Sequence, residues 1–185
     1  GRIYMKATGI VRRIDDLGRV VVPKEIRRTL RIREGDPLEI FTDREGEIIL
    51  KKYSPIGELG QFAKQYADSL AQTTGYIVAI SDKDQFIAVA GSVKSLISKG
   101  ISRELEAAIN DRETVIASHD DKNFIKITDE DDTEFTYQVI CPIISEGDAI
   151  GSVIILTKDP KVKFGDTEVK LASTAAAFLG RQMEQ

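Results

Sequence analysis

The chain has 185 residues, of which 42% are hydrophobic and 30% are charged, and its formal net charge is −4. This composition suits a soluble globular protein. No apolar run approaches the roughly 18 residues that a membrane-spanning helix needs. The single cysteine, Cys141, excludes an intrachain disulfide. We therefore expect a protein of the cytoplasm that has no membrane partner.

The charge is distributed unevenly along the chain. The first 53 residues hold 13 basic and 9 acidic side chains, a net charge of +4, whereas the remainder holds 13 and 21, a net charge of −8. The sign changes at a Pro/Gly boundary, Ser54-Pro55-Ile56-Gly57. Such an asymmetry is typical of two modules with different partners. We expect one domain over residues 5–53 and a second over 54–185.

The first domain is predicted to be mostly β. Alternating apolar positions predict a strand over 8–14, a turn over 15–18 and a β-branched strand over 19–22. Pro23 suits the first position of a short helix over 24–30. After a turn at 34–37, strands over 38–42 and 47–53 form a hairpin.

A domain this small is expected to depend on a second copy of itself. A chain of about 60 residues buries only about 60% of its unfolded surface. Short strands also leave open edges that invite pairing with another chain. We therefore expect an obligate dimer, with strands of both protomers in one barrel.

The basic segment, residues 6–33, has a net charge of +6 inside an acidic protein. Arginine suits phosphate oxygens and guanine edges because its guanidinium is planar and bidentate. The segment is expected to bind a polyanion, namely double-stranded DNA. The alternative is a solvated basic face with internal salt bridges, but the segment offers only three carboxylates. Its nine cations are Lys6, Arg12, Arg13, Arg19, Lys24, Arg27, Arg28, Arg31 and Arg33.

The second domain is predicted to be α+β. Ser54 suits a helix N-cap, and a helical spacing of apolar residues continues to about residue 71. Strands are expected over 76–80, 85–90, 114–117, 123–128, 135–144 and 149–157, with helices over 93–97 and 103–110. Asp166 is expected to cap a last helix.

The two terminal helices of this domain carry more apolar side chains than one thin sheet face needs. These are Phe62, Tyr66, Leu70, Leu171, Phe178 and Leu179, with small residues at Ala172, Ala175, Ala176 and Ala177. We expect pairing at this end too, which gives a dimer of dimers. The alternative is that both helices only cover their own sheet.

The run TGIVRRIDDLGRVVVPKEIRRTLRIREGDPLEIF resembles the swapped-hairpin DNA-binding domain of the AbrB-type transition-state regulators. The resemblance implies an intertwined dimeric β-barrel that binds A·T-rich DNA. The DNA-contacting positions of the family fall on Arg12, Arg19, Arg27 and Arg28. Arg13 stands where the family often has lysine, and we expect Arg13 and Lys6 to assist. Antitoxins share this domain, so an autoregulatory protein-interaction module is the alternative function.

The order of elements after residue 54, with Pro142-Ile143, Gly147 and Ile150-Gly151-Ser152-Val153, resembles a GAF sensor domain. The resemblance implies an antiparallel sheet with flanking helices, and a cavity for a small molecule whose identity is open. The two domains together resemble regulators of sporulation. This resemblance implies a forespore transcription regulator that activates or represses genes.

The residues that most often carry catalysis are too few here for an enzyme. The only histidine, His119, is expected in an exposed loop rather than in a metal site or a pH switch. The acidic run 129–132 lacks the spacing and glycine of an EF-hand, so a solvated loop is expected. Cys141 is expected to be a small core residue rather than a nucleophile. We predict neither a catalytic residue nor a metal nor a cofactor.

Overall fold

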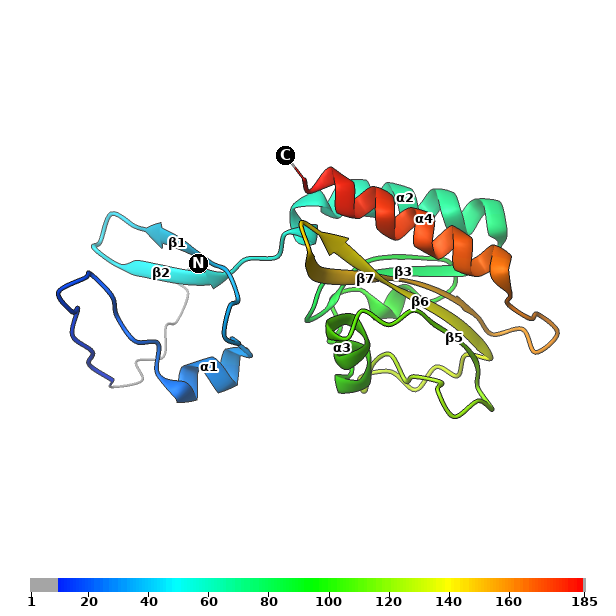
Figure 1. Cartoon of the computed structure of the whole chain (residues 1–185), viewed down its shortest axis with the longest axis horizontal. Coiled ribbons are helices and arrows are strands. Elements are labelled where there is room, and N and C mark those ends of the chain that lie inside the picture. Colours follow the sequence, from blue (N-terminus) through cyan, green and yellow to red (C-terminus); the bar gives the residue numbers. More distant parts are fainter. Residues whose placement is uncertain (1–9, 185) are drawn as a thin grey trace. The chain divides into compact units, whose positions relative to one another are not determined.

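The computed structural model describes residues 10–184 of the chain, except the side chain of residue 94. It divides into two compact units, Gly1–Tyr53 and Ser54–Gln185. They are called the first and the second unit below (Figure 1). No helix within the described residues is long and apolar enough to cross a membrane.

The first unit contains one short helix and one hairpin. Helix α1 (Lys24–Leu30) begins directly after Pro23. It ends at Arg31, whose left-handed backbone (φ 57°) lets its N–H and that of Ile32 bond to carbonyls of the last turn. Strands β1 (Leu38–Thr42) and β2 (Ile48–Lys52) pair antiparallel as predicted.

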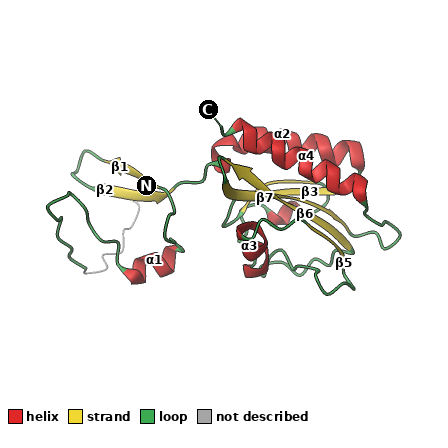
Figure 2. Ribbon diagram, in the orientation of Figure 1, coloured by secondary structure: helices red, strands yellow, loops and turns green. Residues whose placement is uncertain are grey.

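The predicted strands over 8–14 and 19–22 are absent from the described residues 10–22, which Figure 2 draws as loop. Residues 8 and 9 lie outside the described part. The turn between them is present, with the Asp15 N–H bonded to the Arg19 carbonyl at 2.9 Å and Gly18 at φ 75°. A strand needs a neighbour for its backbone N–H and C=O groups. The described part of this single chain provides no such neighbour to 10–14 or 19–22.

No described residue of the first unit is buried. Eleven of its large apolar side chains are instead exposed: Val11, Ile14, Leu17, Val20, Val21, Leu30, Ile40, Phe41, Ile48, Ile49 and Leu50. The unit as a single chain therefore lacks the buried core that normally stabilises a domain.

The second unit is a five-stranded antiparallel sheet with helices on both faces. Its strands, in the spatial order β4-β3-β7-β6-β5, are β3 (Ile77–Ser81), β4 (Phe86–Ala90), β5 (Val115–Ser118), β6 (Tyr137–Ser145) and β7 (Asp148–Thr157). Its helices are η1 (Ile56–Leu59), α2 (Gly60–Thr74), η2 (Lys94–Leu96), α3 (Arg103–Asn110) and α4 (Asp166–Gln182). Helices α2 and α4 lie side by side on one face, and α3 lies on the other (Figure 1).

Two hydrophobic layers fill the spaces on either side of this sheet. Alternate residues of β6 point to opposite layers: Val139, Cys141 and Ile143 contribute to the layer below α2 and α4, and Ile140 to the layer below α3. This period of two is what a strand covered on both faces requires. The second unit therefore has a core of its own.

Three local predictions for the second unit differ from the structure. Residues 123–128 form a loop rather than a strand, because the buried side-chain amide of Gln138 satisfies both backbone groups of Ile125, each at 2.7 Å. Residues 93–97 contain only the short 3-10 helix η2. At α4, Asp166 is the first helical residue and not the cap, and the Glu168 carboxylate accepts the Gly165 N–H at 2.8 Å.

Helix α4 approaches β6 closely at Gly180, where an added Cβ would overlap the carbonyl oxygen of Ile144. We expect Gly180→Ala to lower the free energy of unfolding of the second unit by about 1–3 kcal/mol, because neither backbone can yield without disturbing its packing. Urea unfolding followed by circular dichroism would measure this loss. Gly60→Ala is the matched control, since no atom lies within 4 Å of an added Cβ there. Equal stability of the two variants would contradict the prediction.

Candidate nucleic-acid interface

The turn at 15–19 is organised by one carboxylate. Asp15 Oδ1 accepts the backbone N–H groups of Leu17 at 2.9 Å and Arg19 at 2.8 Å. Its Oδ2 accepts Nε of the Arg19 guanidinium at 2.9 Å. The hydrogen bond from the Arg19 backbone, followed by that from its guanidinium, lowers the pKa of Asp15 below its ordinary value. The Arg19 side chain remains 70% exposed, so it is anchored at one nitrogen and otherwise open to solvent.

Helix α1 carries the next two arginines in its last turn. Arg27 donates Nε to the carbonyl oxygen of Val22 at 3.1 Å, across the start of the helix. Arg28 follows it, and both side chains are exposed. Because Val22 lies three residues after Arg19, the same short segment carries one anchored arginine and supports a second.

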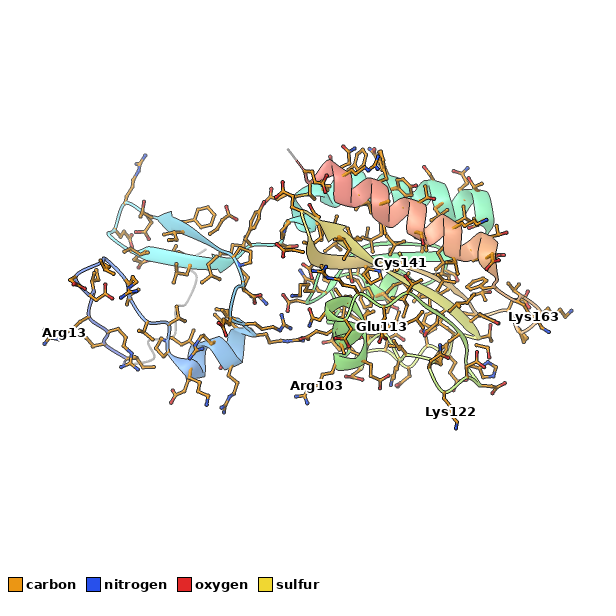
Figure 3. The ribbon with its side chains drawn as sticks, viewed as in Figure 1. Arg13, Arg103, Glu113, Lys122, Cys141 and Lys163 are labelled. Carbon is orange, nitrogen blue, oxygen red and sulfur yellow. The ribbon has the colours of Figure 1, made fainter. Side chains whose placement is uncertain are left out.

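Arg12 and Arg13 are exposed in the segment that leads into the turn, and Arg13 projects away from the ribbon (Figure 3). The described part of the chain gives no ion pair to Arg12, Arg13, Arg27 or Arg28. Within the described residues, carboxylates therefore pair with Arg19 and Arg33 but not with these four guanidinium groups. The predicted contribution of Lys6 lies outside the described residues.

The sequence predicts a turn at Asp15 but not the three hydrogen bonds that the Asp15 carboxylate accepts there. The available signal was its spacing, because an aspartate at the start of a turn commonly accepts backbone N–H groups two to four residues on. A carboxylate four residues before an arginine can also reach that guanidinium when the turn closes. The anchoring of Arg27 by the Val22 carbonyl has no such signature in the sequence.

Three acidic side chains lie close together at the tip of the β1–β2 hairpin. Ligand atoms of Asp43, Glu45 and Glu47 lie within 4.8 Å of one another. Asp43 accepts the backbone N–H groups of Glu45 at 3.0 Å and Glu47 at 2.8 Å. Hydrogen bonding and charge from Asp43 raise the pKa of Glu47. The backbone bonds account for the arrangement as a tight turn.

His119, Cys141 and the run 129–132, which were expected to lack a chemical role, lie in different surroundings. His119 is exposed, with one ring nitrogen 3.3 Å from the Thr136 carbonyl oxygen. Cys141 is buried, with its sulfur 3.7 Å from the Ser173 hydroxyl. The run 129–132 is only partly a solvated loop, because Asp131 is half-buried. Hydrogen bonds from Thr133, then from Ser95, hold the pKa of Asp131 well below its ordinary range.

The second unit also contains a cavity of about 650 Å³ that is partly open to solvent and is lined by the loop 119–136. Phe124, Ile125, Ile127 and Phe135 supply apolar walls, whereas the other lining residues are polar or charged and include the carboxylates of Asp131, Asp132 and Glu134. Apolar surface beside polar groups that can orient a ligand is a feature of small-molecule sites.

Comparison with known proteins places both units. Residues 58–184 match the family described as "Stage V sporulation protein T C-terminal, transcription factor". The chain is 56% identical over 182 residues to stage V sporulation protein T of Bacillus subtilis (strain 168), which covers 98% of this chain and 100% of that protein. The chain belongs to the stage V sporulation protein T family. This relationship confirms the resemblance to sporulation regulators.

The first unit has relatives of its own. Residues 11–58 match the family "Antidote-toxin recognition MazE, bacterial antitoxin". Over 53 residues the chain is 64% identical to the transition state regulatory protein AbrB of Bacillus subtilis (strain 168), covering 29% of this chain and 54% of that protein. The predicted AbrB-type resemblance is thereby confirmed.

Solved structures bear on the fold of the second unit. A methyl-accepting chemotaxis protein fragment matches with a TM-score of 0.56 at 18% identity, covering 68% of this chain and 93% of the fragment. The GAF domain of an Acinetobacter phosphoenolpyruvate-protein phosphotransferase matches with a TM-score of 0.53 at 12% identity, covering 70% and 90%. At these identities the likeness concerns the fold alone, and it confirms the GAF-like α+β prediction.

Proposed function

We propose that this protein is a DNA-binding transcription regulator of sporulation genes, active in the forespore cytoplasm without catalysis. Residues 5–53 bind double-stranded DNA, and residues 54–185 assemble the oligomer. The observation that carries the proposal is a set of exposed arginines that have no carboxylate partner among residues 10–184: Arg12, Arg13, Arg27 and Arg28, together with the anchored Arg19. Such a surface contacts phosphates and, where a guanidinium is well placed, base edges.

The DNA-binding unit works as a dimer. A second copy can cover its eleven exposed apolar side chains and can pair with segments 10–14 and 19–22, which have no strand neighbour among the described residues. Strands of two protomers in one barrel would form a shared buried core and would give each open strand edge a neighbour. Dimerisation also doubles the basic segment. A protein surface that contacts mainly the DNA phosphates suits A·T-rich DNA, because such DNA is recognised partly through its shape.

This dimer predicts the behaviour of an isolated fragment of residues 5–53. Because the described residues of a single copy bury no side chain, the fragment should sediment as a dimer when folded. On dilution it should lose secondary structure and dimer mass together. Analytical ultracentrifugation and circular dichroism over a concentration series would measure both. A folded monomer would contradict the arrangement.

Arg19→Glu is predicted to abolish DNA binding. The change reverses one charge per protomer and removes the anchored guanidinium, while the dimer persists. If about four arginines per protomer contact phosphates, the wild-type slope of log affinity on log salt should be about −7. Fluorescence anisotropy with a labelled duplex would measure both effects. The control is Arg103→Glu, because Arg103 projects from α3 in the second unit (Figure 3). Wild-type affinity of the Arg19 variant would contradict the assignment.

The second unit pairs through the outer face of α2 and α4. The Phe178 ring packs against Phe62 and Tyr66, with centroids 5.5 and 5.6 Å apart. Phe62 and Phe178 nevertheless remain 37% and 38% exposed. Leu179, predicted to serve pairing, is fully buried against its own sheet, as are the alanines at 172 and 175. The pairing surface is therefore aromatic and narrower than the sequence suggested.

Phe178→Ser is predicted to convert a dimer of dimers into a dimer. The change removes the ring shared by Phe62 and Tyr66 at the centre of the aromatic face. Multi-angle light scattering of the full chain should give the mass of two copies in place of four. Ile97→Ser, on another exposed apolar residue, should leave the mass unchanged. A wild-type protein with dimer mass at every concentration would rule out the pairing.

The cavity under the loop 119–136 is the proposed place for a small-molecule signal. Its ligand would act by changing how the DNA-binding dimers are held together.

An antitoxin-like function has one supporting observation, the match of residues 11–58 to an antitoxin family. The folded core of the second unit favours the regulator, because a toxin-binding tail is usually disordered before it meets its partner.

A further inference from the structure

We propose that Asp15 is a positioning residue for DNA recognition, which holds the guanidinium of Arg19 so that its outer nitrogens face the DNA. This inference rests on the proposed function and adds an acidic residue to a surface otherwise defined by its cations.

The geometry assigns two tasks to one carboxylate. Oδ1 closes the turn through the backbone N–H groups of Leu17 and Arg19, at 2.9 and 2.8 Å. Oδ2 takes Nε of Arg19 at 2.9 Å. The two terminal nitrogens of the guanidinium are not used by this bond. They form the pair of donors that suits a guanine edge or two phosphate oxygens.

Asp15 would be unfavourable in this segment if charge alone mattered. A carboxylate next to an anion-binding arginine repels phosphate and cancels part of the basic charge. Asp15 therefore costs sequence-independent affinity. Its benefit is that Arg19 loses less rotamer freedom when it meets the DNA, since the turn and the side chain are already fixed. Preorganisation of this kind favours the duplex on which the fixed geometry fits.

Asp16 provides a matched comparison. It lies next to Asp15, carries the same charge and is exposed. The described residues give Asp16 neither an ion pair nor a side-chain hydrogen bond. Removing the charge of Asp16 thus changes the electrostatics of the segment without releasing Arg19.

The test uses the full-length protein and two duplexes. One is selected by the wild type from a random-sequence pool, and the other is a scrambled version of it. Asp15→Asn keeps an oxygen for the two backbone N–H groups but loses the charged partner of Nε. We expect about tenfold weaker binding to the selected duplex and unchanged or tighter binding to the scrambled one. Asp16→Asn should tighten both slightly.

A double-mutant cycle separates positioning of Arg19 from a general effect on the turn. In an Arg19→Ala background, Asp15→Asn should no longer weaken binding to the selected duplex and should tighten it slightly, as Asp16→Asn does. Arg19→Lys keeps the charge but removes the fork, and should reproduce the tenfold loss without any change in the turn. An Asp15→Asn effect of equal size in both backgrounds would overturn the inference in favour of a structural role.

The outcomes also distinguish this inference from the function on which it rests. Wild-type protein that binds neither duplex overturns the proposed function and this inference with it. Wild-type protein that prefers the selected duplex, with Asp15→Asn behaving like Asp16→Asn, overturns the inference alone.

Discussion

Burial of apolar surface is the constraint on which the first unit depends. A buried valine, leucine, isoleucine or phenylalanine side chain stabilises a fold by about 1.5–3 kcal/mol relative to its exposed form. In the first unit, Ile40, Phe41 and Ile48 are among eleven such side chains that the single chain leaves exposed. The proposed second copy would bury them, so folding and association become one equilibrium. In that case the arginines would be presented to the DNA by a dimer rather than by a single copy.

The second unit forms its core without a second copy, because its sheet is covered on both faces by helices of the same chain. Fully buried residues such as Ile80, Ile140 and Leu156 fill its two layers. Close approaches at Gly151 and Gly180 leave no room for a side chain between neighbouring backbones. The core of this unit is therefore complete within the single chain, unlike that of the first unit.

The sequence predicted those elements whose signals are local. Helix α3 has the predicted bounds, and the hairpin at β1–β2 and the strands β6 and β7 lie within two residues of their predicted ends. Predictions from the sequence were wrong where a segment's hydrogen-bonding partner is far away along the chain or is not in the chain's described part. Residues 123–128 have strand-like composition, but a side chain of β6, Gln138, takes the hydrogen bonds of Ile125. Residues 10–14 and 19–22 have strand patterns, but no neighbour within the described chain. The arginines of the candidate site could be predicted from residue type alone. The hydrogen bond from Arg19 Nε to the Asp15 carboxylate could not, because it depends on how the turn closes.

The positions of the cavity and of the aromatic face limit how a signal could reach the DNA-binding unit. The loop that encloses the cavity follows β5, and Ile127 belongs to the hydrophobic layer below α3. Phe62 and Phe178 lie on α2 and α4, on the other face of the sheet (Figure 1). A ligand can shift assembly only by as much as it binds one arrangement better than another. β6 is one strand that contacts both sides, because its Gln138 bonds to the loop and its Cys141 lies against Ser173 of α4.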